Sequence, residues 1–77
     1  MELEHAFGVV LKRHRKALSL SQEELALRCN LDRTFIGLLE RGERRPTLKS
    51  VFVLAQNLNV SPSDLVREVE KQLTQDS

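Results

Sequence analysis

The chain has 77 residues, of which 40% are hydrophobic and 30% charged, and its formal net charge is +1. This length predicts one domain with a modest core, and the single cysteine, Cys29, excludes an intramolecular disulfide. No apolar run approaches the length of a membrane span, and the acidic start MELEHAFG is unlike a signal peptide, so we expect a cytoplasmic protein with no membrane partner.

The charges are unevenly distributed along the chain. Residues 1–49 hold ten Lys and Arg against seven Asp and Glu, whereas residues 50–77 hold two bases against four acids. This asymmetry suggests that an anionic partner meets the first part of the chain. Leu, Glu, Arg, Lys and Ala are abundant and aromatic residues are few, which favours helices over strands.

The first predicted helix covers roughly residues 3–18 and carries an apolar stripe at helical spacing. The stripe consists of Leu3, Phe7, Val10, Leu11, His14 and Leu18. The stretch KRHRK, residues 12–16, is expected across the solvent side of this helix. His14 stands where an apolar residue is more usual, and we expect a partly buried, hydrogen-bonded histidine rather than a ligand-binding one.

Two short helices follow, each with a clear start. Ser21 opens an S-x-x-E capping box, which predicts a helix over residues 22–29. After a turn at Asn30-Leu31, Asp32 is a good N-cap for a helix over residues 33–41, and Gly42 ends it. The expected inward residues of these two helices are Leu25, Ala26, Cys29, Ile36, Leu39 and Glu40. The opposite side of the 33–41 helix carries Thr34, Gly37, Leu38 and Arg41.

Two more helices complete the prediction. Thr47 caps a helix over about 48–58, and Ser61-Pro62 starts one over about 62–73. Their apolar positions are Val51, Leu54, Ala55, Leu58, Leu65, Val66, Val69 and Leu73. No segment reads as a strand, so the predicted fold is all-α, a compact bundle of five short helices.

The helices at 22–29 and 33–41 are joined by about three residues, which is the helix-turn-helix arrangement. At this point the sequence resembles the phage-repressor-like (XRE, or Cro/CI) helix-turn-helix regulators over about residues 7–66. The pieces that carry the resemblance are Arg15, LSQEELA at 20–26, LDRTFI at 31–36, ERG at 40–42, RPTL at 45–48, and Leu54-Ala55, Leu58 and Val60-Ser61. The chain length and the sequence motif "LDRTFI…ERGERRPT" are similar to those of the small controller proteins of restriction–modification systems.

The resemblance implies a lambda-repressor-like DNA-binding domain spanning residues 1–77, with the helix at about 62–73 available for dimerisation. It implies a transcriptional regulator that binds double-stranded DNA, and a two-fold homodimer of such a domain would face an inverted-repeat operator. With no ligand-binding domain, we expect no small-molecule ligand and no cofactor.

The start of the 33–41 helix is the predicted base-reading end. Arg33 can bond guanine O6 and N7 together, and Thr34 offers a hydroxyl or a methyl contact to thymine. Gly37 would let DNA approach closely, and Leu38 would touch a thymine methyl. The alternatives are a solvated helix start for the first two residues and an isolated surface leucine for Leu38.

Phosphate contacts are expected from residues on both sides of the 33–41 helix. Gln22 begins a helix whose free amides can meet a phosphate, although it could merely start that helix. The remaining candidates are Arg41, Arg44, Arg45 and Lys49, with a solvated charge cluster as the alternative. Phe35 is a candidate for packing against the DNA backbone, or for extending the core.

Glu40 shares the buried face of its helix, and a buried carboxylate needs a partner. The family resemblance supplies that partner as Arg15, in a structural salt bridge between the first and third helices. A homodimer is expected through Leu65, Val66, Val69 and Leu73, with Phe52 or Val53 as possible additions.

Other functions are less well supported by the sequence. His5, His14 and Cys29 make no metal-ligand cluster and no nucleophile–base pair, so no catalytic or metal-binding residue is assigned and no enzyme is expected. The remaining alternative is a protein-interaction module, such as an antitoxin or adaptor, that would use its last helix to bind a protein.

Overall fold

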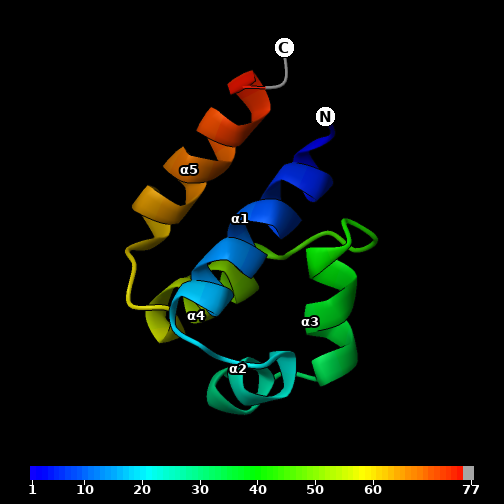
Figure 1. The fold of residues 1–77 in the computed structure, drawn as a ribbon, viewed down its shortest axis with the longest axis vertical. Coiled ribbons are helices and arrows are strands. Elements are labelled where there is room, and N and C mark those ends of the chain that lie inside the picture. The colour runs from blue at the N-terminus through cyan, green and yellow to red at the C-terminus, as the bar shows by residue number, and fades with distance from the viewer. Residues whose placement is uncertain (76–77) are drawn as a thin grey trace.

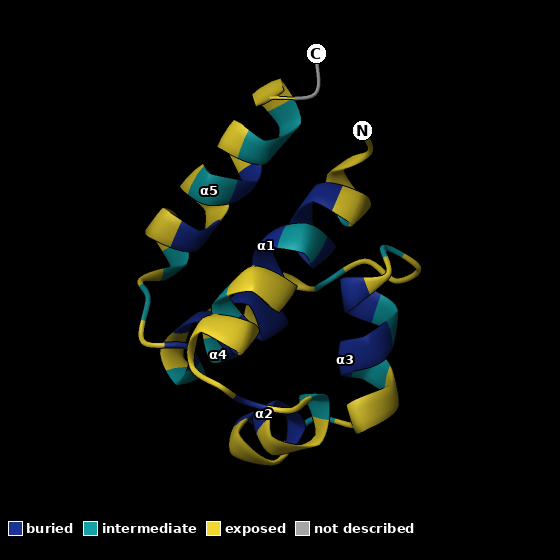
Figure 2. Cartoon of the chain, viewed as in Figure 1, coloured by how far each residue is buried: buried dark blue, intermediate teal, exposed yellow. Residues whose placement is uncertain are grey.

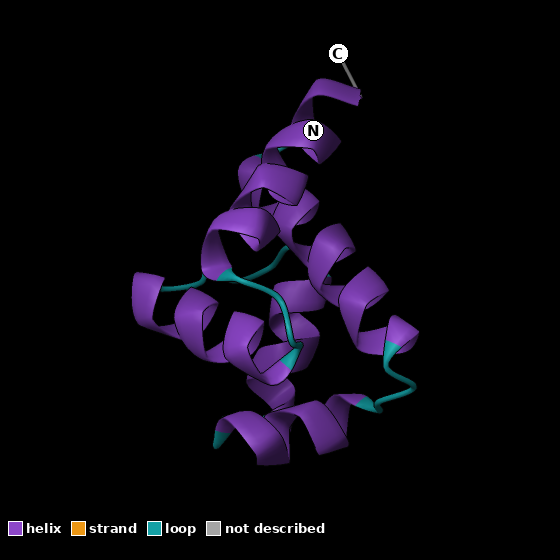
Figure 3. Cartoon of the chain, turned by 90° about the vertical axis from the view of Figure 1, so that its left-hand side faces the viewer, coloured by secondary structure: helices purple, strands orange, loops and turns teal. Residues whose placement is uncertain are grey.

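The structure is a computed structural model, and it describes residues 1–75, so the last two residues of the expected 1–77 domain lie outside the described part. Residues 1–75 form helices and loops without a strand, which confirms the all-α fold (Figures 1 and 3). The helices are α1 (Leu3–Ala17), α2 (Gln22–Cys29), α3 (Arg33–Glu40), α4 (Leu48–Asn57) and α5 (Pro62–Gln75). Within residues 1–75, none of these helices is long and apolar enough to cross a bilayer.

The first four helices end in the same way. Each is followed by a left-handed residue, with φ of 57° at Ser19, 55° at Asn30, 73° at Gly42 and 60° at Asn59. The next amide in each case donates to the carbonyl five residues back, for example from Leu31 to Ala26 at 2.9 Å. This 6→1 bond is the Schellman motif, which satisfies carbonyls that the helix itself leaves free.

Side-chain hydrogen bonds cap the N-termini of α2, α3 and α4, as the sequence predicts. The hydroxyl of Ser21 accepts from the amide of Glu24, whose carboxylate accepts from the amide of Ser21. Asp32 accepts from the amide of Thr34 at 3.3 Å. Thr47 forms the same kind of reciprocal box with Ser50, although the usual capping-box pattern has Glu or Gln at that position. These bonds fix where α2, α3 and α4 begin.

The core lies where α1 packs against both α3 and α5, while α2 packs on α3 and α4 (Figure 1). Its largest fully buried side chains are Val10, Leu11, Leu25, Ile36, Leu39, Leu54 and Leu65. Burial runs along one side of each helix, and the exposed sides of α2 and of the first turn of α3 lie at one end of the molecule (Figure 2).

The prediction of the apolar stripe on α1 is wrong at both ends of the helix. Leu3 is 60% exposed and Leu18 is 37% exposed, because each lies at an end of the helix where its neighbours cover less of it. Ala6 and Gly8 are buried instead. A side chain at Gly8 would place its Cβ 2.5 Å from the carbonyl oxygen of Leu39, so the absence of a side chain lets α1 cross the end of α3 in close contact.

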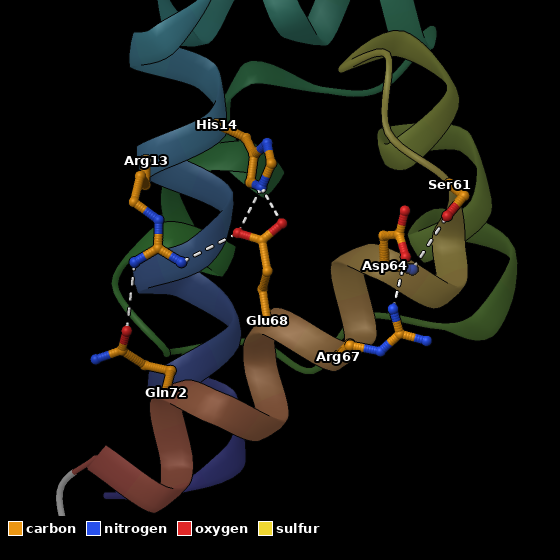
Figure 4. A network of polar contacts seen from close by, with 7 residues as sticks. All are labelled: Arg13, His14, Ser61, Asp64, Arg67, Glu68 and Gln72. Carbon is orange, nitrogen blue, oxygen red and sulfur yellow. Dashed lines mark hydrogen bonds and ion pairs between the residues drawn. The ribbon is translucent and has the colours of Figure 1, made fainter.

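A polar cluster ties α5 to α1 (Figure 4). Nε2 of His14 lies 2.8 Å and 2.9 Å from the two carboxylate oxygens of Glu68, and Arg13 donates to Glu68 at 3.2 Å. His14 is therefore half-buried and hydrogen-bonded, as expected, although its partner 54 residues away was not foreseen. Burial by itself would raise the pKa of Glu68. The hydrogen bonds from His14 and Arg13 outweigh burial and hold this pKa below its ordinary value.

Candidate nucleic-acid interface

The α2–α3 unit presents the first turn of α3 to solvent (Figure 2). Residues 30–32 join the two helices, and the left-handed Asn30 turns the chain between them. Arg33 and Thr34 are exposed on the first turn of α3, while Ile36 and Leu39 are fully buried on the other side. The packing that fixes α3 thus leaves its amino-terminal end open to a partner.

A shallow pocket of about 190 Å³ lies beside this end of α3. It is lined by Gln22, Arg33, Thr34, Gly37 and Arg41, so one helix start from α2 and the outer side of α3 meet in it. All five are residues for which the sequence predicts DNA contact. Leu38 is half-buried and is not part of the lining.

Behind the pocket lies a buried ion pair. Arg15 donates from Nε to Oε2 of Glu40 at 2.6 Å and from Nη2 to Oε1 at 2.9 Å, a two-bond geometry. The side chains are only 9% and 3% exposed, and a third bond joins Arg15 to the carbonyl of Leu20 at 2.7 Å. The hydrogen bond with Glu40 outweighs the effect of burial and raises the pKa of Arg15 above its ordinary value.

Gln22 is connected to this ion pair, a contact that the sequence pattern does not predict. Its Nε2 donates to Oε1 of Glu40 at 3.0 Å, so a residue at the surface is held by a carboxylate in the core. The sequence spacing could not predict this hydrogen bond, because the two residues are 18 positions apart and lie on different helices.

The basic residues that follow α3 do not form one cluster. Arg41 pairs with Glu43 at 2.8 Å beside the pocket, whereas Arg45 pairs with Glu4 of α1 at 2.9 Å. Arg44 is exposed in the loop between them, and Lys49 is exposed in the first turn of α4. The structure therefore distributes the four candidates over different parts of the surface.

Phe35 is half-buried and packs against the core. It lines a separate cavity of about 400 Å³ together with Cys29, Lys49 and Val53. Cys29 itself is buried, and burial raises the pKa of its thiol. A phenyl ring in this position has no polar atom to offer a phosphate.

The expected dimer surface on α5 needs a correction. Leu65 and Val69 are 0% and 4% exposed within the single chain, because α5 uses them to pack on the core. Leu73 is partly buried against the same core, and Val66 is 53% exposed. Of the four residues, Val66 is therefore the one most available to a partner, and Phe52 on α4 is also exposed, at 54%.

The exposed part of α5 borders an apolar pocket of about 300 Å³. Its lining includes Leu3, Pro46, Val51 and Val66, with the Glu4–Arg45 ion pair among its lining residues. Arg45 thus belongs to this flank of the molecule and not to the pocket beside α3.

Comparison with known proteins places this geometry in a family. The helix-turn-helix family matches residues 11–65. The control protein C.SmaI of Serratia marcescens is 39% identical over 69 residues, which cover 88% of this chain and 82% of that protein.

Solved structures of restriction–modification controller proteins share the fold. C.AhdI from Aeromonas hydrophila superposes with a TM-score of 0.78 at 40% identity, covering 80% of this chain and 94% of that one. C.Esp1396I, solved as a tetramer in complex with its natural 35-base-pair operator, superposes with a TM-score of 0.86 at 32% identity. That match covers 96% of this chain and 97% of that one.

Proposed function

The chain belongs to the helix-turn-helix family, and from this premise we propose that it is a sequence-specific transcriptional regulator that binds operator DNA. The observation that carries the proposal is the first turn of α3, where Arg33 and Thr34 stand exposed on a helix anchored by the core. The likeness to C.Esp1396I, which has been solved on its operator, supports the same conclusion. DNA binding places the protein's action in the cytoplasm.

In this proposal α3 enters the major groove and α2 lies across the DNA backbone. Arg33 donates to guanine O6 and N7, and Thr34 contacts the neighbouring base. The exposed Arg44 and Lys49, which come before and after the capped start of α4 in the chain, contact phosphates. Leu38 and Phe35, both half-buried, contribute apolar contacts at the edge of the interface.

The operator-binding form in this proposal is a symmetric homodimer. The α4–α5 flank exposes Val66 beside the apolar pocket and Phe52 on α4, and apolar surface on a small domain favours a partner of the same kind. A two-fold dimer would place its two α3 helices about 34 Å apart, one turn of B-DNA, and would therefore bind an inverted repeat. The Glu4–Arg45 pair lies at the rim of this surface.

A gel-shift titration with DNA upstream of the protein's own gene tests the proposed function. We expect a discrete shifted complex, and Arg33→Ala should weaken it about tenfold or more, since one bidentate base contact is lost. Arg67→Ala is the matched control, because it removes an equally charged, exposed side chain from α5. Equal behaviour of both variants, or no specific complex, would favour the protein-interaction alternative.

Light scattering at micromolar concentration tests the dimer. The wild type should have twice the mass of one chain, and Val66→Asp should shift it to monomer by placing a charge on the apolar flank. A wild-type protein that remains monomeric both free and on DNA would overturn the dimer.

A further inference from the structure

Gly37 is buried although it lies on the outer side of α3, next to the exposed Thr34. Side chains from two other positions cover it. An ideal Cβ at Gly37 would lie 3.3 Å from Nη1 of Arg41 and 3.6 Å from Oε1 of Gln22. The space that a side chain at position 37 would occupy is therefore bordered by a guanidinium group and an amide oxygen.

The orientation of Gln22 follows from simple chemistry. Its amide contacts Oε1 of Glu40 at 3.0 Å, and a carboxylate paired with an arginine can only accept a hydrogen bond. The nitrogen of the amide must therefore face Glu40, and the oxygen is left on the pocket side, above Gly37. A phosphate has only acceptor atoms, so the amide oxygen of Gln22 cannot hydrogen-bond to a phosphate. It can instead accept a hydrogen bond from an amino group on a base edge.

Arg41 is oriented from the other side. Its Nε donates to Glu43 at 2.8 Å, and its Nη1 lies over Gly37 in the same pocket. The guanidinium thereby presents donors beside the acceptor of Gln22. Donors and an acceptor next to each other are complementary to a G·C pair, which shows the N7 and O6 acceptors of guanine and the N4 amino donor of cytosine in the major groove.

We propose that Gln22 and Arg41 together read one G·C base pair at the place that Gly37 leaves open. Arg41 donates to guanine O6 and N7, and Gln22 Oε1 accepts from cytosine N4. The ion pair of Arg15 with Glu40 acts through Gln22, so Glu40 is a positioning residue for base recognition as well as part of the core. This inference rests on the proposed function, and it gives Gln22 and Arg41 a base-reading role in place of the phosphate role expected from the sequence.

Selection from a random DNA library, followed by titration of single-base variants, tests the proposal. The wild type should prefer one G·C pair in each half-site, beside the base read by Arg33, by about 5- to 150-fold, the range for a good bidentate contact. Arg41→Lys keeps the charge but loses the planar fork, so it should lose that preference and retain the others. Its salt dependence should match that of the wild type, because the number of cations is unchanged.

Gly37→Ala is the second variant. Its methyl group would displace the end of Arg41 by a few tenths of an ångström, and it should weaken the preference at the same base pair. The fold should tolerate the change, since the nearest atoms belong to flexible side chains and alanine is the better helix former. Lys12→Ala is the control, because Lys12 is exposed on α1 and does not line the pocket, and it should leave this preference intact.

The possible results distinguish failure of this proposal from failure of the proposed function. Unchanged preferences in both Arg41→Lys and Gly37→Ala would overturn this proposal while leaving operator binding in place. A preference at this position for a pair other than G·C would also overturn it. A wild-type protein that selects no sequence at all would overturn the proposed function as well.

Discussion

The inner and outer sides of α3 are built under different constraints. On the inner side, Leu39 and Glu40 are buried, and Gly8 brings α1 so close that any Cβ there would overlap the backbone of α3. On the outer side, Gly37 is covered only by the ends of two long side chains, which can move. The comparison indicates that stability is concentrated on the inner side of the helix, which leaves the outer side for the base recognition that we propose.

The largest expected effect is on the inner side. Glu40→Ala leaves the buried Arg15 without its partner, and we expect a loss of about 3–5 kcal/mol in the free energy of unfolding. Urea denaturation measures this loss. The double variant Arg15→Met with Glu40→Leu should cost less than either single change, because no buried charge is left unpaired. Strictly additive losses would show that the two residues are not coupled.

Gly8→Ala and Gly37→Ala should differ in sign. The first places a methyl group 2.5 Å from a backbone carbonyl, and separating α1 from α3 should lower stability by about 1–3 kcal/mol. The second should raise stability by up to about 1 kcal/mol through helix propensity. Thermal unfolding of the two variants under one buffer condition makes the comparison. If Gly37→Ala were as damaging as Gly8→Ala, the two sides of α3 would not differ as described.

Changes to exposed cations should affect binding but not folding. Lys49→Ala should leave the free energy of unfolding within about 0.5 kcal/mol of the wild-type value. In a binding titration it should weaken every DNA sequence alike and reduce the slope of log affinity against log salt by about 1. Lys12→Ala, on the exposed side of α1, is the control. An equal change of slope in this variant would show that Lys49 is not a specific phosphate contact.

A further modest effect on stability is expected away from α3, in the cluster of Figure 4. The lowered pKa of Glu68 means that its carboxylate stabilises the fold above the ordinary pKa of 4.5, and that this contribution is lost as the pH falls through the lower folded value. Glu68→Gln should therefore cost less than about 1 kcal/mol at pH 7, as for other partly exposed pairs. Urea titrations from pH 7 to pH 3 should show the difference disappearing in acid, and a constant difference would contradict this origin.

Much of the local structure was predictable because its causes lie within a few residues. Asp32 and Thr47 cap helices through amides two and three residues away, and Gly42 ends α3 because it adopts a left-handed conformation. Apolar spacing placed Ile36 and Leu39 on the buried side of α3, as the structure confirms. The motif pattern, read in order, then led to the family that the comparison with known proteins establishes.

The contacts between helices were harder to predict because they depend on how the helix axes cross. The apolar pattern of α5 could not show that Leu65 and Val69 would be used by the chain's own core and Val66 left exposed. Likewise, sequence alone gave no reason for Arg45 to pair with Glu4 of α1 and not to remain beside α3.

The sequence by itself therefore determined the helices, their ends and the family, since propensity, capping and apolar spacing act over one or two turns. Only the tertiary structure decided that Gln22 would be held by Glu40 and would share the space above Gly37 with Arg41. Distances between side chains on different helices are fixed by packing, and a change of crossing angle would separate the same residues. The sequence supplies the candidate residues for DNA contact, but the direction in which Gln22 and Arg41 present their donors and acceptors is set by the fold.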